Sequence, residues 1–163
     1  MTLRIGSPIP SAYLARLSPQ GSIEVAHTDT LFAAGRLLVI GVPGAFTPVC
    51  TRQHLPDFIA KADLIRASGY DRICCIASSD PYSLAAWTAQ IDPLAKLDFF
   101  SDGNLAFARA CKMNTREDAM FLGERSRRFV LDVKEGLLRR IRVEPDLLSI
   151  SCTRASAVVT LEL

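Results

Sequence analysis

The stretch "RLLVIGVPGAFTPVCTRQHLP", residues 36–56, joins a short apolar run to a segment with the features of a helix start. The run at residues 36–42 has the length and composition of a buried strand. Thr47 is a preferred N-cap residue, and Pro48 suits the first helical position. A helix is therefore predicted from Thr47 to about residue 68, with Gly69 as its stop. Cys50 would lie in the first turn of this helix.

Outward from this unit, strands and helices are predicted to alternate. Two further strands are expected at residues 71–78 and 97–102, and helices at 80–90, 103–113 and 152–163. Residues 13–27 and 127–143 read as antiparallel hairpins around turn sequences. No repeat or linker interrupts the pattern. The sequence thus predicts one α/β domain over residues 1–163, a three-layer sandwich in which helices flank a mixed central sheet.

Composition excludes several classes of function. The chain has 163 residues, 22% of them charged, with a net charge of +2 and no basic run, so nucleic acid is not an expected partner. No apolar stretch approaches the ~20 residues that span a membrane. The five cysteines are an odd, scattered set, which does not suggest a disulfide framework. Since no secretory pattern opens the sequence, the expectation is a cytoplasmic protein with reduced thiols.

Cys50 is the first candidate functional residue. The unpaired amides and the dipole of a helix start stabilise a thiolate. Ionising most of an ordinary thiol at neutral pH requires roughly 3.4 kcal/mol of differential stabilisation. A helix end supplies up to about 2 kcal/mol, so a cation must supply the rest. The segment "ERSRRF", residues 124–129, holds three arginines that could do so. The alternative is that Cys50 is a small buried hydrophobe.

His54 follows Cys50 by one helical turn, which raises a second possibility. A Cys–His pair is the signature of cysteine hydrolases. A histidine in the second turn of a helix is, however, more commonly a partly exposed or packing residue. The sequence has no CxxC motif, no zinc-like ligand spacing and no phosphate-binding glycine loop. No metal or cofactor is therefore expected.

The residues around Cys50 carry a family resemblance. Pro43, Thr47 and Cys50 match the peroxiredoxin pattern Pro-x-x-x-Thr/Ser-x-x-Cys, and "GVPGAFTPVCTRQHLP" resembles the type-5 peroxiredoxins, including the plant type II proteins. "SDPYSLAAW", "RRFVLDV" and "VEPD" extend the resemblance over nearly the whole chain. It implies a thioredoxin-like fold and a thiol peroxidase, without metal or haem, that serves antioxidant defence and redox homeostasis.

The resemblance also implies a role for each matching residue. Cys50 falls at the peroxidatic cysteine, Thr47 at the hydroxyl that holds the peroxide, and Pro43 at the proline that shields the thiolate. Arg128 falls at the arginine over the sulfur and would be the missing cation. The expected substrates are hydrogen peroxide and small alkyl hydroperoxides, and the expected product is a sulfenic acid on Cys50.

The thiol that resolves this sulfenic acid stays open. Cys152 falls at the resolving position of the animal type-5 proteins, and Cys75 at the spacing of the plant type II proteins. Cys152 is favoured for its more polar setting. An external thiol, from glutathione, glutaredoxin or thioredoxin, is the third possibility.

Two further expectations complete the sequence reading. The resemblance implies pairing of two copies near the active-site end, with Phe46, Pro48 and Phe121 as candidate contacts. The alternatives to a peroxidase are a Cys–His hydrolase built on Cys50 and His54, and a non-catalytic redox sensor on the same fold.

Overall fold

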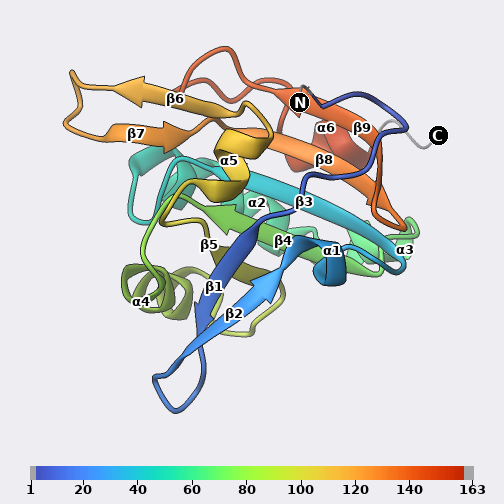
Figure 1. The fold of residues 1–163 in the computed structure, drawn as a ribbon, viewed down its shortest axis with the longest axis horizontal. Coiled ribbons are helices and arrows are strands. Elements are labelled where there is room, and N and C mark those ends of the chain that lie inside the picture. Colours follow the sequence, from blue (N-terminus) through green and yellow to red (C-terminus); the bar gives the residue numbers. More distant parts are fainter. Residues whose placement is uncertain (1–2, 160–163) are drawn as a thin grey trace.

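A computed structural model describes residues 3–159 (Figure 1). Its centre is a seven-stranded mixed sheet with the strand order β2-β1-β5-β4-β3-β8-β9. The strands are β1 (Tyr13–Leu17), β2 (Ile23–His27), β3 (Arg36–Val42), β4 (Arg72–Ala77), β5 (Asp98–Ser101), β8 (Phe129–Lys134) and β9 (Leu137–Val143). β3, β4 and β5 run parallel, whereas the β1–β2 and β8–β9 hairpins and the β3–β8 and β1–β5 pairs are antiparallel. The predicted mixed sheet is confirmed.

Helices cover both faces of this sheet. They are α1 (Thr28–Leu31), a π-helical turn (Cys50–His54), α2 (Leu55–Ala60), α3 (Ala62–Ala67), α4 (Pro81–Ile91), α5 (Ala106–Ala110) and α6 (Ala155–Val159). Side chains of α2, α3, α4 and α6 pack on one face in an apolar cluster that also holds Cys50 and Cys75. Phe32, Phe107 and Cys74 belong to the cluster on the other face. Two apolar cores separated by one sheet confirm the thioredoxin-like three-layer sandwich.

Local sequence signals explain the elements that were predicted correctly. Asp80 caps α4, and its carboxylate accepts hydrogen bonds from the amides of Tyr82 and Ser83, both at 2.9 Å. At the β8–β9 turn, Glu135 and Gly136 have φ values of 52° and 76°, as a two-residue hairpin turn requires. The closing helix begins at Ala155, later than the predicted residue 152, and the last four residues of the prediction, 160–163, lie outside the described part of the chain.

The long helix predicted from Thr47 to residue 68 is wrong in detail. The first helical residue is Pro48, as predicted, but residues 50–54 widen into the π-helical turn, and Lys61 separates α2 from α3. The amide of Leu55 donates to the carbonyl of Cys50, five residues back. The next residue, Pro56, has no amide hydrogen, and its ring would crowd the carbonyl four residues earlier in a regular α-helix. Pro56 therefore accounts for the widened turn that begins at Cys50.

Two further segments differ from the prediction. The expected helix at residues 103–113 is limited to α5, because Leu105 and Lys112 on either side of it have φ values of 57° and 56°. No element was predicted at residues 114–126, yet β6 (Asn114–Glu117) and β7 (Gly123–Ser126) form a two-stranded ribbon that projects from the body of the protein in Figure 1. This ribbon leads the chain to Arg128, the residue directly before β8.

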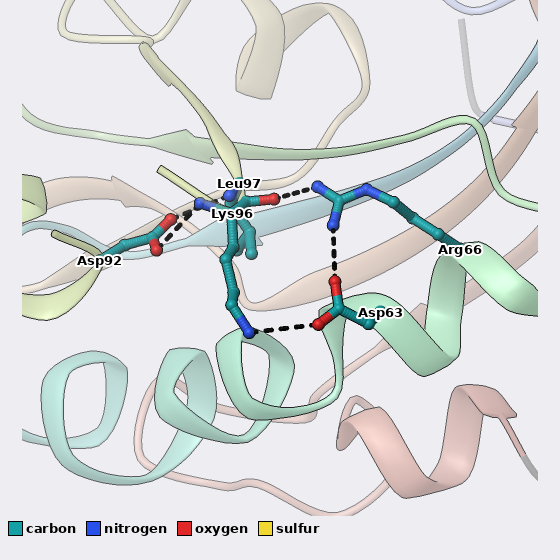
Figure 2. A network of polar contacts seen from close by, with 5 residues as sticks. All are labelled: Asp63, Arg66, Asp92, Lys96 and Leu97. Carbon is teal, nitrogen blue, oxygen red and sulfur yellow. Dashed lines mark hydrogen bonds and ion pairs between the residues drawn. The ribbon is translucent and has the colours of Figure 1, made fainter. Parts of the chain in front are cut away.

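A polar network fastens α3 to the loop between α4 and β5 (Figure 2). Asp63 on α3 forms ion pairs with Arg66 at 3.5 Å and with Lys96 at 3.4 Å. Arg66 also donates to the carbonyl of Lys96, and Asp92 accepts from the amides of Lys96 and Leu97. These contacts fasten α3 to the loop that leads into β5, the neighbour of the cysteine-bearing strand β4. Within residues 3–159, no helix has the length and hydropathy needed to cross a membrane.

Candidate active site

Cys50 lies at the start of the π-helical turn, beyond the end of β3. Its side chain is completely buried, in the same apolar cluster as Cys75. The connecting loop is fixed by a hydrogen bond from the Ala45 amide to the Ser79 hydroxyl, 2.8 Å long. Pro43 is buried in this loop. The first candidate residue is thus a thiol at a helix start, shielded from bulk solvent.

Arg128 is the cation beside this thiol. Its guanidinium is 1% exposed, and its Nη1 donates to the Sγ of Cys50 at 3.3 Å and contacts the Nδ1 of His54 at 3.1 Å. Its Nη2 donates to the carbonyl of Leu147 at 3.0 Å. Within residues 3–159 its Nε has no hydrogen-bond partner. The site therefore places the fixed positive charge of Arg128 beside the Cys50 sulfur. The buried Nε of Arg128 is a donor that can still bind an acceptor.

The other two arginines of residues 124–129 donate elsewhere. Arg125 donates to the carbonyls of Ser78 and Leu122, both at 2.7 Å. Arg127 donates to the carbonyl of Glu144 at 2.9 Å. Sequence reasoning required one cation from this segment, and the structure brings Arg128 to Cys50.

His54 is buried rather than partly exposed. Its Nε2 lies 2.9 Å from the carbonyl of Thr153, an acceptor, so the proton is assigned to Nε2, and Nδ1 accepts from Arg128. Burial, followed by the charge of Arg128, lowers the pKa of His54 from 6.5 to about 4. His54 is therefore neutral near pH 7. Because its free lone pair faces the guanidinium, this geometry does not provide a base for Cys50 and does not favour the Cys–His hydrolase.

The side chain of Thr47 does not cap the helix in the way that the sequence predicts. Its carbonyl accepts the first helical hydrogen bond, from the amide of Thr51 at 3.0 Å, whereas its hydroxyl donates to the carbonyl of Gly44 at 3.0 Å. The single hydroxyl hydrogen is thus in use. The oxygen keeps its lone pairs, so Thr47 can act toward a bound molecule as an acceptor.

The other four cysteines are free thiols in two kinds of setting. Cys75 is buried on β4, and burial, followed by the nearby Cys50 and Cys74, raises its pKa. Burial raises the pKa of both Cys74 and Cys111 to about 12 on the other side of the sheet. Cys152 is partly exposed, and its Sγ donates to the carbonyl of Val143 at 3.6 Å. Of the two predicted resolving candidates, Cys152 is the one that solvent can reach.

Glu144 is a buried polar residue that sequence reasoning did not single out. Its carboxylate accepts four hydrogen bonds, from the amide and the hydroxyl of Ser151 and of Thr153, at 2.7–2.8 Å. Burial works against ionisation, but these hydrogen bonds outweigh it and lower the pKa of Glu144 to about 2. The available signal was the "VEPD" tetrapeptide followed by "SCT", a carboxylate and two hydroxyl residues around Cys152.

No metal ligand set is assembled by the described part of the chain, residues 3–159, where no three His, Cys, Asp or Glu side chains gather in a way that could hold an ion. The polar groups that gather at Cys50 are the guanidinium of Arg128, which contacts the sulfur, and the neutral imidazole of His54, which contacts Arg128; Thr47 precedes Cys50 by three residues in the sequence. This set can stabilise an anion at the sulfur and orient a small oxygen-containing molecule beside it.

Comparison with known proteins identifies related sequences. The Redoxin family model matches residues 4–158. The chain is 35% identical over 148 residues to the chloroplastic peroxiredoxin-2E-2 of Oryza sativa subsp. japonica, covering 88% of this chain and 65% of the relative. It is 30% identical to the chloroplastic peroxiredoxin-2E of Arabidopsis thaliana, covering 88% and 62%. The chain thus spans somewhat less than two thirds of the length of these two curated relatives.

Solved structures show the same architecture. The reduced Prx3 of Vibrio vulnificus in complex with hydrogen peroxide superimposes with a TM-score of 0.90 at 27% identity, over 99% of this chain and 96% of the other. The Plasmodium falciparum antioxidant protein, a 1-Cys peroxiredoxin, gives a TM-score of 0.89 at 27% identity, over 98% of both chains.

The expectation of a cytoplasmic location is wrong by this comparison, since the two relatives described above are chloroplastic proteins. The expectation rested on the lack of a secretory pattern in the first residues. The lack of a secretory pattern does not identify a compartment, because the fold of a domain does not specify where the protein is located.

Proposed function

The chain is a peroxiredoxin of the redoxin family, and we propose that it is a thiol peroxidase that reduces hydrogen peroxide and small organic hydroperoxides through Cys50. The observation that carries the proposal is the 3.3 Å contact between the Nη1 of Arg128 and the Sγ of Cys50, inside a buried site. We further infer that residues 1–163 form a single domain of this family, in which the protein serves antioxidant defence.

The geometry supports a direct displacement. The Cys50 thiolate attacks one peroxide oxygen, an S–O bond forms, and the O–O bond breaks. The second oxygen leaves as water or as an alcohol after taking up a proton. Negative charge moves from sulfur to oxygen along this path, and the Nη1 and free Nε of Arg128 are fixed donors for it. Thr47 accepts the O–H of the bound peroxide, and Pro43 keeps water from the thiolate.

Turnover then requires a second thiol. Cys50 sulfenic acid condenses with Cys152, Cys75 or an external thiol, and a reductant such as glutathione, glutaredoxin or thioredoxin restores the enzyme. We place Cys152 first because it is partly exposed, whereas Cys75 is completely buried. A buried thiol that stays protonated is a poor nucleophile.

We also propose that two copies pair at the active-site end. Phe46 is 50% exposed and Phe121 is 96% exposed, and both have left-handed backbone conformations, with φ values of 62° and 55°. Pro48, two residues after Phe46, is also exposed. Exposed aromatic rings on strained turns are features of interaction surfaces. Sedimentation of the wild type beside Phe121→Asp tests the pairing, which predicts a smaller species for the variant.

Consumption of hydrogen peroxide with dithiothreitol as reductant tests the peroxidase. We expect continuous turnover in the wild type and none in Cys50→Ser. A substantial residual rate in Cys50→Ser would contradict the mechanism. A single equivalent consumed without turnover would indicate the redox sensor, and thiol-dependent ester hydrolysis in the absence of peroxide would indicate the hydrolase.

A further inference from the structure

The chain after β9 is held down by one buried carboxylate. Glu144 follows the last residue of β9, is completely buried, and accepts hydrogen bonds from the amides and hydroxyls of both Ser151 and Thr153. Cys152 lies between these two residues. Its backbone therefore cannot shift appreciably without breaking hydrogen bonds to Glu144. We call residues 145–153 the Cys152 segment.

The same segment is bound to both polar side chains that flank Cys50. The carbonyl of Leu147 accepts from the Nη2 of Arg128 at 3.0 Å. The carbonyl of Thr153 accepts from the Nε2 of His54 at 2.9 Å. The Cys152 segment thus closes over Arg128, which contacts the Cys50 sulfur, and over His54, which contacts Arg128, and Glu144 fixes the end of the segment that carries the thiol.

In this closed arrangement the two sulfurs have different neighbours. The Sγ of Cys50 is completely buried beside Arg128, and the Sγ of Cys152 donates to the carbonyl of Val143. Burial, followed by the charge of Glu144, raises the pKa of Cys152 and keeps it a thiol. A disulfide requires the two Cα atoms to lie about 4.4–6.8 Å apart with the side chains facing each other. Because the Sγ of Cys152 is directed to the Val143 carbonyl and Cys50 is completely buried beside Arg128, Cys152 must leave this carbonyl and Cys50 must become accessible before an S–S bond can form.

We propose that Glu144 is a positioning residue that latches the Cys152 segment closed while peroxide reacts, and that release of this latch sets the rate at which Cys152 attacks oxidised Cys50. The inference rests on the proposed peroxidase function with Cys152 as the internal resolving thiol. In the controlled step, the Sγ of Cys152 forms an S–S bond with the sulfenic sulfur of Cys50. The S–O bond breaks, and the hydroxyl leaves as water with the proton of the Cys152 thiol.

The chain contains its own reporter for this sequence of events. Trp87 is the one tryptophan of the sequence, and its Nε1 donates to the hydroxyl of Thr51 at 3.1 Å, next to Cys50. Its fluorescence should report oxidation of Cys50 and the rearrangement of the first helical turn. Rapid mixing of the reduced protein with hydrogen peroxide should give one phase whose rate rises with peroxide concentration and a second that is independent of it. Acid quenching and mass spectrometry assign the second phase to the Cys50–Cys152 bond.

The decisive variant is Glu144→Gln, which keeps the shape of the side chain but removes its charge and replaces one acceptor oxygen by a donor. We expect the second phase to become about tenfold faster or more, as for the loss of one hydrogen bond to a charged acceptor, with the first phase changed by less than about twofold. The matched control is Asp146→Asn. This carboxylate lies in the same segment but is exposed, and its partners are Leu148 and Ser149. Both phases should be unchanged in it.

Two results would overturn the latch. The first is an unchanged or slower second phase in Glu144→Gln, whether or not the first phase also slows, and the second is a wild type that retains sulfenic acid and shows no second phase. If Glu144→Gln does not fold, Thr153→Val removes one donor to the carboxylate without loss of volume, and it must accelerate the second phase. A wild type without any peroxide-dependent phase would instead refute the peroxidase function itself.

Discussion

Protonation of His54 should destabilise the folded protein in a defined range of pH. His54 is completely buried, and both ring nitrogens are occupied, by the carbonyl of Thr153 and by the guanidinium of Arg128. A proton added at Nδ1 would turn the acceptor of Arg128 into a second cation. Because the pKa is lowered from 6.5 to about 4, the unfolded chain binds more protons than the folded one between these values. The neutral form of His54 therefore contributes fully to the free energy of unfolding above pH 6.5. This contribution is lost as the pH falls from 6.5 to 4.

The magnitude follows from the two pKa values. The full difference corresponds to about 3 kcal/mol, and about 2 kcal/mol of it should disappear between pH 7 and pH 5. Urea unfolding followed by the fluorescence of Trp87, at intervals between these two pH values, measures the loss. His54→Gln provides the reference, because glutamine can donate and accept but does not titrate. Carboxylates and His27 contribute equally to both proteins, so the difference between their pH profiles isolates His54.

A second variant guards against a general effect of histidine protonation. His27 lies on β2 at the far edge of the sheet, away from His54, so His27→Gln should retain the loss of stability that His54 causes between pH 7 and pH 5. Equal losses of stability in the wild type and in His54→Gln between pH 7 and pH 5 would refute the reasoning. The same acidification should slow the reaction with peroxide, because charged His54 repels Arg128 from the sulfur.

Three further predictions concern the site and the fold. Arg128→Lys keeps the charge but removes the guanidinium that donates both to Cys50 and to the Leu147 carbonyl. The reaction with peroxide should therefore slow by about 10²-fold in stopped-flow assays. A rate within a factor of two of the wild type would mean that charge alone suffices. Gly41→Ala would place a Cβ 2.1 Å from the ring of Phe129 and should lower the free energy of unfolding by about 1–3 kcal/mol, whereas unchanged urea unfolding would show that the ring can move aside. Asp80→Ala removes the cap of α4 and should cost about 1 kcal/mol in the same assay without changing peroxidase activity.

Local patterns in the sequence determined much of the framework. The apolar run of β3, the turn at Gly136 and the cap of α4 by Asp80 are decided by neighbours within a few residues, so periodicity and turn chemistry identified them. The same holds for the placement of Cys50 at a helix start. The π-helical turn was not predicted, because the cap residues at its start favour a regular helix and the widening comes from Pro56, six residues after Cys50.

Weak local signals left other parts undetermined. The sequences of β6 and β7 are short and polar, and the ribbon is fastened by contacts such as the ion pair between Arg109 and Glu124, which no local pattern reports. The burial of Glu144 was equally invisible, since a glutamate in a polar stretch ordinarily lies in solvent. Its hydrogen-bond partners follow it by seven and nine residues, across a segment without regular structure.

The chemistry around Cys50 was only half determined by the sequence. Elementary electrostatics required a cation for the thiolate, and the family resemblance pointed to Arg128, but the contact joins residues 78 positions apart. The hydrogen bond from His54 to Thr153 spans 99 positions. Pairing of β3 with β8 brings Arg128 to the end of the sheet where Cys50 lies, and closure of the Cys152 segment buries His54. Such contacts depend on the register of strands and on the burial of charge, which are properties of the whole packed chain and not of any stretch within it.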